Sequence, residues 1–365
     1  LAAADGRVLA TDLVAGLDLP PWPNSAMDGY ALRLADWQGE PLPVSQRILA
    51  GQAPEPLQPG TCARIFTGAP LPAGADTVEM QENAEILADG RVSFLEPIKV
   101  GQNVRPQGQE TRAGDVVLPA GTRLGPVELG LAASLGCAVL VVRRRPRVAV
   151  VSTGDELVEP GRPLGPGQIY NSNRPLLKDW LQRLGCDVLD AGILPDDLAR
   201  TRERLAGLAG VDLILSTGGV SVGEADFLGM ALREAGELTL WKLAIKPGKP
   251  LTVGQFQGIP VIGLPGNPVS VLATYLTLGR TLLDGLQGRA DARPRLRARL
   301  RTPWRKTHDR LEFLRGRLAC DDGTLWVEPN PADGSHRMRA AADSDALIVL
   351  GEGEQALDAG AVVDV

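Results

Sequence analysis

The segment 147–285 constrains the fold most, because short apolar runs alternate in it with amphipathic stretches. The apolar runs include 148–152 (VAVVS), 212–219 (DLILSTGG) and 259–266 (IPVIGLPG), whereas 173–185, 197–210 and 225–236 have helical spacing. This alternation is typical of a mostly parallel α/β sheet that is covered by helices on both faces. Ligands of such sheets bind beyond the carboxyl ends of the strands, so we expect the functional site there.

The flanking regions have other patterns, which predict a multi-domain chain. Residues 16–111 are interrupted by proline and glycine and contain short strand-like runs, which indicates an inserted β-rich domain. Residues 126–137 have helical spacing, and we expect a strand at 138–142 before the basic turn at 143–147. From about 290 onward the sequence alternates again without a good helix, which predicts a small β domain. A length of 365 residues with 43 Gly and 29 Pro also favours several domains.

Composition excludes several classes of protein. A net charge of −6 argues against a protein that binds nucleic acid or an anionic membrane in general. The arginines of 295–301 (RLRARLR) have a period of two, so we expect them on one solvated face. No apolar run approaches the length of about 20 residues that a membrane span needs, and no signal pattern opens the chain. Four distant cysteines without a C-x-x-C pair, and two histidines, predict neither a zinc site nor a disulfide framework, and we expect a cytoplasmic location.

A glycine-rich loop follows the apolar run at 212–217. Its glycines Gly218, Gly219 and Gly223 let consecutive backbone N–H groups turn toward one point, and Ser221 adds a hydroxyl. The acidic residues Glu224 and Asp226 follow at once. The pattern predicts a site for a phosphate or another oxyanion. The alternative is a tight turn that only needs glycine.

Carboxylates also follow two other predicted strands. Asp155 and Glu156 lie in the stretch VSTGDEL, and Asp196 and Asp197 lie in LPDD. Carboxylates gathered at neighbouring strand ends repel one another unless a cation relieves the repulsion, which indicates a divalent ion or a polar substrate. The alternative for the second pair is an N-cap of the helix that starts at 198.

Two proline-containing loops complete the set. The stretch WKLAIKPGKP supplies Lys242, Lys246 and Lys249, which are suitable point charges for an oxyanion; an exposed basic turn is the alternative. The stretch LPGNP places Pro265 and Pro268 at the start of a helix, whose free N–H groups would face the same edge of the sheet.

Three upstream residues are weaker candidates. Asp28 lies in an Asp-Gly turn, Thr67 precedes Gly68, and Glu110 lies between two arginines. A simple turn and a surface cluster of ion pairs are the alternatives.

Taken in order along the chain, these stretches resemble the molybdopterin molybdenumtransferase family of the MoeA type, to which the E domain of gephyrin is related. The stretches are NSAMDGYALR, IFTGAPLPAGADTV, VRPQGQE, VSTGDEL, GQIYNSNRPLL, STGGVSVGEADF, WKLAIKPGKP and GLPGNPVS. The resemblance implies a homodimer with an elongated dimerisation domain (1–15 and 112–142), an inserted β-rich domain (16–111), an α/β molybdopterin-binding domain (143–286) and a C-terminal β-barrel (287–365).

The resemblance also implies a reaction: insertion of molybdate into adenylylated molybdopterin, with release of AMP and with Mg²⁺ as activator. It assigns catalysis to Asp28, Thr67, Glu110, Glu156, Asp196 and Asp226, and metal binding to Glu156, Asp196 and Asp226. The substrate-binding residues it implies are Gly218, Gly219, Ser221, Gly223, Lys242, Lys246, Lys249, Pro265, Pro268, Arg310, Ser335 and Arg337. Expected partners are a molybdopterin adenylyltransferase and molybdoenzyme acceptors or chaperones.

Three positions depart from the family pattern. Glu110 replaces an expected Asp, 344–347 (SDAL) is more polar than usual, and we expect a helix that would precede GRVLATD to be missing. Two other functions stay open from the residues alone: a molybdopterin adenylyltransferase, and a gephyrin-like scaffold. The adenylyltransferase would need neither residues 1–140 nor the β-rich tail.

Overall fold

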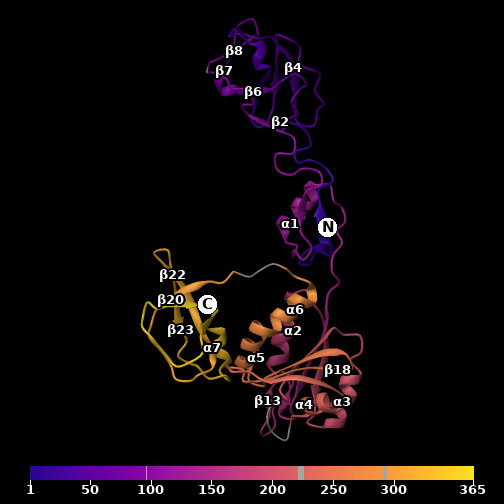
Figure 1. Ribbon diagram of the computed structural model, residues 1–365, viewed down its shortest axis with the longest axis vertical. Helices are drawn as coiled ribbons and strands as arrows, with labels where there is room; N and C mark the ends of the chain where they lie inside the picture. Colours follow the sequence, from indigo (N-terminus) through magenta and orange to yellow (C-terminus); the bar gives the residue numbers. More distant parts are fainter. Residues whose placement is uncertain (96, 221–225, 291–293) are drawn as a thin grey trace. The chain divides into compact units, whose positions relative to one another are not determined.

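The computed structural model describes residues 1–95, 97–220, 226–290 and 294–365 (Figure 1). The chain forms two compact units. Unit 1 comprises Leu1–Asp5, Thr11–Ala120 and Gly125–Val141, and unit 2 comprises Gly6–Ala10, Gly121–Leu124 and Val142–Val365.

Unit 1 is built mainly from short strands. Its largest sheet has the order β4-β5-β3-β6, and three antiparallel pairs, β1 with β10, β2 with β9 and β7 with β8, accompany it. The elements are β1 (Leu13–Val14), β2 (Asn24–Ser25), β3 (Gly29–Leu32), β4 (Val44–Ile48), β5 (Cys62–Ile65), β6 (Thr77–Met80), β7 (Ala84–Ile86), β8 (Val92–Phe94), β9 (Val104–Arg105), β10 (Val116–Leu118) and α1 (Pro126–Ser134), with single 3₁₀ turns at Ala2–Ala4, Leu34–Asp36 and Gln81–Asn83.

The four-stranded sheet of unit 1 is covered on both faces. Ala31 of β3 packs with Ile65 and Val78 on one face, whereas its neighbours Tyr30 and Leu32 pack in a second cluster on the other face. Successive side chains of a strand point to opposite faces, so both clusters stabilise one sheet. The predicted β-rich region is confirmed.

The predicted strand at 138–142 is wrong. Within the described residues only Val142 pairs there, in a single bridge with Leu9, and the side chains of Val139 and Val141 are exposed. A β-branched run forms a strand only where a partner edge and a packing surface extend along it. Here the pairing is limited to Val142, and Val139 and Val141 are exposed.

Unit 2 contains a six-stranded sheet of order β14-β11-β15-β19-β18-β16. The strands β14, β11, β15 and β19 are parallel. At one edge β18 pairs antiparallel with β19 and β16 pairs antiparallel with β18, so β16 again runs in the direction of the parallel strands. The sequence prediction of a mostly parallel sheet is therefore confirmed. The strands are β11 (Arg147–Thr153), β14 (Asp187–Leu194), β15 (Leu213–Thr217), β16 (Gly236–Lys242), β18 (Pro250–Phe256) and β19 (Ile259–Leu264), and a separate parallel pair joins β12 (Leu157–Val158) to β13 (Ile169–Tyr170).

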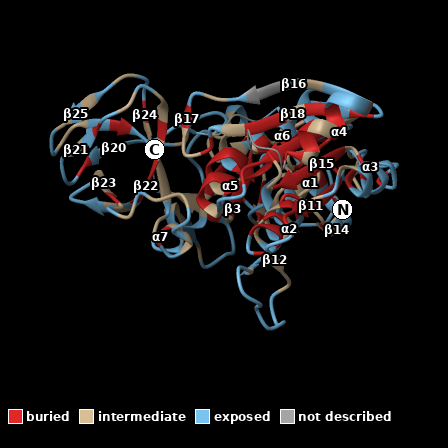
Figure 2. Cartoon of the chain, turned by 90° about the horizontal axis from the view of Figure 1, so that it is seen from below, coloured by how far each residue is buried: buried red, intermediate tan, exposed pale blue. Residues whose placement is uncertain are grey.

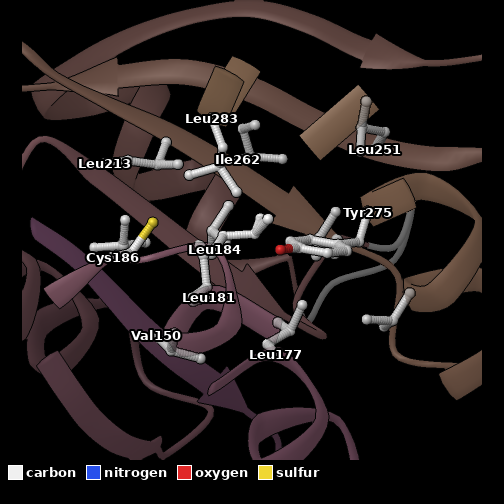
Figure 3. Packing of buried hydrophobic residues seen from close by; sticks show 14 residues of the cluster. Val150, Leu177, Leu181, Leu184, Cys186, Leu213, Leu251, Ile262, Tyr275 and Leu283 are labelled. Carbon is white, nitrogen blue, oxygen red and sulfur yellow. The ribbon is translucent and has the colours of Figure 1, made fainter. Parts of the chain in front are cut away.

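Helices cover both faces of this sheet. They are α2 (Asn173–Arg183), α3 (Leu198–Ala206), α4 (Phe227–Ala235), α5 (Pro268–Thr274) and α6 (Arg280–Gln287), with a π-helical turn at Tyr275–Gly279. One apolar cluster joins the sheet to α2, α5 and α6, and a second joins its other face to α3 and α4. Figure 3 shows Leu177, Leu181 and Tyr275 in the first cluster. In Figure 2 the buried residues gather in β11, β15 and β18 and on the inner faces of the helices.

The C-terminal part of unit 2 is a closed five-stranded β-barrel, as predicted. Its strands pair in the order β22-β23-β20-β26-β24 and back to β22. The short strand β17 pairs in parallel with β22 and so links the barrel to the α/β part. The elements are β17 (Ile245–Lys246), β20 (Arg297–Leu300), β21 (Trp304–Lys306), β22 (Leu311–Asp321), β23 (Thr324–Pro329), α7 (Met338–Ala342), β24 (Ala346–Leu350), β25 (Gln355–Leu357) and β26 (Val362–Asp364).

Two details of the barrel concern the sequence predictions. Arg297 and Arg299 are exposed and alternate with buried Ala298 and Leu300, as the period of two predicts. The short helix α7 was not predicted from the sequence, because five residues between loop segments give too little periodicity. Within the described part of the chain, no helix combines the length and the apolar character that crossing a membrane requires.

Candidate functional site

The carboxyl ends of the four parallel strands meet at one edge of the sheet of unit 2. The last residues of these strands are Thr153, Leu194, Thr217 and Leu264. The loops that follow border an open cavity of about 480 Å³. Its lining consists of Thr153, Gly154, Glu156, Leu157, Ile169, Asn173, Asp196, Thr217, Gly218, Gly219, Val220, Pro250, Pro265, Gly266, Asn267 and Ser270. The cavity thus lies at the edge of the sheet at which the sequence predicts a site.

Glycine is required where β15 ends. Gly218 and Gly219 have φ angles of +81° and +63°, which side chains rarely adopt. A Cβ on Gly219 would lie 2.5 Å from the Thr153 hydroxyl oxygen, and one on Gly218 would lie 2.6 Å from the Thr153 carbonyl oxygen. The loop therefore packs backbone against the end of β11, and the Gly218 N–H donates to the Leu264 carbonyl at 3.1 Å. Ser221 and Gly223, predicted as part of this loop, lie outside the described residues.

The acidic pairs at the strand ends have separate roles. Glu156 and Asp196 line the cavity. Asp155 accepts a hydrogen bond at 3.1 Å from the backbone N–H of Asp196, which fixes the loop after β14. Asp197 is the N-cap of α3 and accepts the N–H of Arg200 at 2.8 Å. Of the two roles considered for this pair, Asp196 thus has the place in the site and Asp197 has the N-cap.

Asp226 has a different position from the other predicted metal ligands. It is buried, caps α4 by accepting the N–H of Gly229 at 2.8 Å, and is not among the residues that line the cavity. Its Oδ2 atom has no hydrogen-bond partner among the described residues. Burial raises the pKa of this carboxyl.

Several cavity residues were not singled out from the sequence. Asn173, the first residue of α2, donates from Nδ2 to the Gly266 carbonyl at 2.6 Å and so ties α2 to the loop after β19. The hydroxyls of Ser152 and Thr217 lie 3.0 Å apart across neighbouring strands. One available signal was the repeated Ser-Thr-Gly at the ends of β11 and β15, which brings hydroxyls to neighbouring strands with Ser152 opposite Thr217. No comparable local signal indicates Asn173.

Lys246 belongs to a second cluster, on β17 beside the barrel. Its Nζ lies 2.9 Å from Oε1 of Glu312 and 3.7 Å from Oδ2 of Asp333. Arg310 donates from its guanidinium to the carbonyl of Ile245 at 3.2 Å. The structure thus brings together Lys246 and Arg310, two residues that are far apart in the sequence. Neither lines the cavity described above.

The other predicted site residues of unit 2 lie in the cavity or in the segments before β18, at α5 and in the barrel loop 332–337. Pro265 lines the cavity and Pro268 begins α5, while Lys242 ends β16 and Lys249 is exposed directly before β18. The carbonyl of Ser335 accepts the N–H of Val269 at 3.0 Å, and the carbonyl of Arg337 accepts from Arg315 at 3.0 Å. The barrel loop 332–337 is therefore attached to the start of α5.

The three upstream candidates belong to unit 1. Asp28 Oδ1 accepts both the backbone N–H and the hydroxyl of Thr67, at 2.8 and 2.7 Å. These two hydrogen bonds hold the pKa of Asp28 below its usual value. The hydrogen bond from the backbone N–H contributes most, and the one from the hydroxyl comes second. Glu110 is exposed, and its backbone N–H donates to the Leu19 carbonyl at 2.9 Å. Asp28 and Thr67 therefore act as one group.

The described residues contain no group of three or more His, Cys, Asp or Glu side chains arranged for a metal ion. In the cavity, Glu156 and Asp196 are the only two carboxylates of the described lining. Mg²⁺ is commonly bound through one or two carboxylates together with substrate phosphates, so this pair fits that mode and not a cage formed by protein alone.

Known proteins resemble this chain over its whole length. Three family descriptions match in order: "MoeA N-terminal region (domain I and II)" at 1–136, "Probable molybdopterin binding domain" at 149–285 and "MoeA C-terminal region (domain IV)" at 297–365. A Haemophilus influenzae protein named molybdopterin molybdenumtransferase is 41% identical, over 100% of this chain and 92% of its own length. A Nostoc protein of the same name is 38% identical, over 99% of this chain and 86% of its own. The crystal structure of a molybdopterin biosynthesis MoeA protein from Pyrococcus horikoshii has a TM-score of 0.85 at 28% identity and covers 100% of this chain and 92% of that one.

Proposed function

This chain belongs to the molybdopterin molybdenumtransferase family, and from that premise we propose how its residues divide the work of the reaction. The protein is a transferase of molybdenum cofactor biosynthesis that acts on molybdopterin and molybdate. We propose that the molybdopterin arrives adenylylated. Molybdenum then forms bonds to the two dithiolene sulfurs while oxygen of the molybdate leaves as water with the two thiol protons. A water molecule cleaves the bond between the two phosphates, so AMP leaves and the pterin product keeps its own phosphate.

The cavity at the sheet edge would hold the pyrophosphate and the pterin. Its volume of about 480 Å³ is within the range of small-molecule sites. The backbone N–H of Gly219 suits a phosphate oxygen, whereas that of Gly218 already donates to the Leu264 carbonyl. The side chains of Asn173, Asn267 and Ser270 suit the polar edge of a pterin. The observation that carries this proposal is the meeting of the strand-end loops around one cavity.

We assign Mg²⁺ to Glu156 and Asp196, with phosphate oxygens as its other ligands. When bound, the ion would neutralise charge on the pyrophosphate. The two carboxylates would orient the phosphates through it, because Asp155 holds the backbone of Asp196 and the Glu156 carboxylate lies against the backbone of Gly154. Asp226 caps α4 and does not line the cavity, so we leave it out of this set.

We propose that molybdate binds at Lys246, with Arg310, Ser335 and the exposed Lys249 around it. Molybdate is a tetrahedral dianion, and lysine supplies a compact point charge with several rotatable donors. Support comes from the pairing of β17 with β22, which brings Lys246 and Arg310 to one place. Lys242 and Arg337 would add positive charge along the route.

The Asp28–Thr67 pair of unit 1 would act on the cavity of a partner subunit in a homodimer. The Thr67 hydrogen bonds keep Asp28 ionised and oriented. Support for a dimer comes from the segments 14–17 and 116–141, whose exposed large apolar side chains are Val14, Leu17, Val116, Val127, Val139 and Val141. We propose a cytoplasmic location, consistent with four unpaired cysteines, with an adenylyltransferase as supplier and molybdoenzymes or their chaperones as recipients.

The adenylyltransferase alternative is not favoured. The relatives named molybdenumtransferase match 98–100% of this chain, including the regions before and after the α/β part that an adenylyltransferase would not need. A scaffold function needs no acidic pair in a cavity, yet Glu156 and Asp196 line one here.

The test is AMP release from adenylylated molybdopterin with Mg²⁺, in the presence and absence of molybdate. We expect molybdate-dependent release from the intact chain, and loss of it in Asp196→Asn and Lys246→Ala. Lys178→Ala is the matched control, because this lysine is also paired with a carboxylate but does not line the cavity. A folded protein that binds molybdopterin but releases no AMP would refute the proposed reaction.

A further inference from the structure

Lys246 lies between two carboxylates that differ sharply in exposure. The side chain of Glu312 is 3% exposed, whereas that of Asp333 is 55% exposed, and Lys246 between them is 30% exposed. Nζ of Lys246 is 2.9 Å from Glu312 Oε1 and 3.7 Å from Asp333 Oδ2. The difference in exposure decides how readily each carboxylate can separate from Lys246.

Glu312 is the permanent partner of Lys246. Its position opposite Lys246 is set by the parallel register of β17 and β22. Its Oε1 also lies 3.5 Å from His308 Nε2, and its Oε2 has no hydrogen-bond partner among the described residues. A buried carboxylate that loses its cation leaves an uncompensated charge, which is strongly unfavourable. Glu312 therefore cannot release Lys246 without loss of stability.

Asp333 is the exchangeable partner. An exposed ion pair contributes little, because water solvates the separated charges almost as well. The backbone around Asp333 is fixed: Arg315 donates to the carbonyls of Ala332, Gly334 and Arg337, and the Asp333 N–H donates to the Pro331 carbonyl at 3.2 Å. The Asp333 carboxylate can thus leave Lys246 by rotation of its side chain, while the loop that carries Ser335 stays in place.

We propose that Asp333 is a displaceable counter-ion, which holds Lys246 until an oxyanion substrate takes its place. The carboxylate oxygens of Asp333 stand where oxygens of the dianion would bind, and the dianion enters by exchange with them. Glu312 acts as a positioning residue, since it keeps Nζ of Lys246 at one point during the exchange. This inference rests on the proposed role of Lys246 in molybdate binding.

Removal of the competing charge should strengthen binding. Asp333→Asn and Asp333→Ala are expected to bind molybdate about two to five times more tightly than the unchanged protein at low salt, the factor appropriate to an exposed ion pair. The gain should shrink as the ionic strength rises from about 0.01 to about 1 M, because salt screens exposed charges. Asp358→Asn, which removes an exposed carboxylate from the same barrel, is the matched control and should leave the affinity unchanged.

The experiment is calorimetric titration of the full chain with molybdate alone, with Lys246→Ala measured in parallel. Tighter binding by both Asp333 variants, with Asp358→Asn unchanged and Lys246→Ala deficient, supports the exchange. Equal or weaker binding by either Asp333 variant, while Lys246→Ala still abolishes binding, overturns the exchange and leaves the proposed role of Lys246 intact. Undiminished binding by Lys246→Ala overturns both. Thermal unfolding of each variant checks that the fold is retained.

Discussion

Gly219→Ala tests the close packing that forms the turn after β15. Gly219 has a φ of +63°, and a Cβ there would lie 2.5 Å from Oγ1 of Thr153. Left-handed backbone costs a side-chain-bearing residue about 1–2 kcal/mol. Thr153 is β-branched, buried and therefore stiff, so the clash adds about 1–3 kcal/mol of overpacking. We expect the substitution to destabilise the α/β part by about 2–5 kcal/mol.

Two further variants separate the backbone cost from the clash. Gly167 has a φ of +78° with nothing within 4 Å of an added Cβ, so Gly167→Ala should cost only the backbone part, about 1–2 kcal/mol. Thr153→Ala removes the clashing hydroxyl, which has no hydrogen-bond partner among the described residues. In that background Gly219→Ala should lose only the backbone part, with a coupling energy of about 1–3 kcal/mol. Gly218→Ala should not be rescued, because its Cβ would meet the Thr153 carbonyl oxygen at 2.6 Å.

The assay is native-state hydrogen exchange of peptides that cover β11 and β15, which measures the free energy of local opening at this place. The reasoning is refuted if Gly219→Ala costs no more than Gly167→Ala. It is also refuted if the Thr153→Ala background leaves the cost of Gly219→Ala unchanged.

Three other expectations follow from the titrating groups. Burial raises the pKa of Asp226 above 3.8, so the folded chain holds this proton at higher pH than the unfolded chain, and the ionised carboxylate costs stability above the folded pKa. Asp226→Asn, which can still cap α4, should be more stable than the native protein at pH 7 and equal to it near pH ~3 in urea unfolding; lower stability at pH 7 would contradict this. Thr67→Val removes one of the two donors to Asp28, so the pKa of Asp28 should rise toward its usual value in an NMR titration, and an unchanged pKa would count against the pair. Burial raises the pKa of Cys62 to about 12, so Ellman's reagent should label exposed Cys320 and spare Cys62 in the folded protein; rapid labelling of Cys62 would contradict its burial.

Local pattern was sufficient for the architecture of unit 2. The runs 148–151 and 213–215 are apolar because β11 and β15 are covered on both faces, so both sets of alternating side chains are buried there. The glycines and acids that follow them mark the strand ends, so Glu156, Asp196, Gly218 and Gly219 were correctly placed at one edge of the sheet. The same local reasoning could not decide which of Asp196 and Asp197 caps the helix and which lines the cavity. Both are aspartates at adjacent positions, and either role suits an aspartate.

Contacts between distant segments were decided only by the tertiary structure. The sequence predicted lysines for an anion, yet nothing near Lys246 indicates that Glu312 and Asp333 lie beside it. The register of β17 on β22 sets that neighbourhood, and it depends on how the barrel closes. Likewise Asn173 reaches Gly266 only because α2 and the loop after β19 pack at the same edge. Burial leaves a periodic trace along the chain, whereas pairing between remote strands leaves none, since it is chosen by the packing of the whole unit.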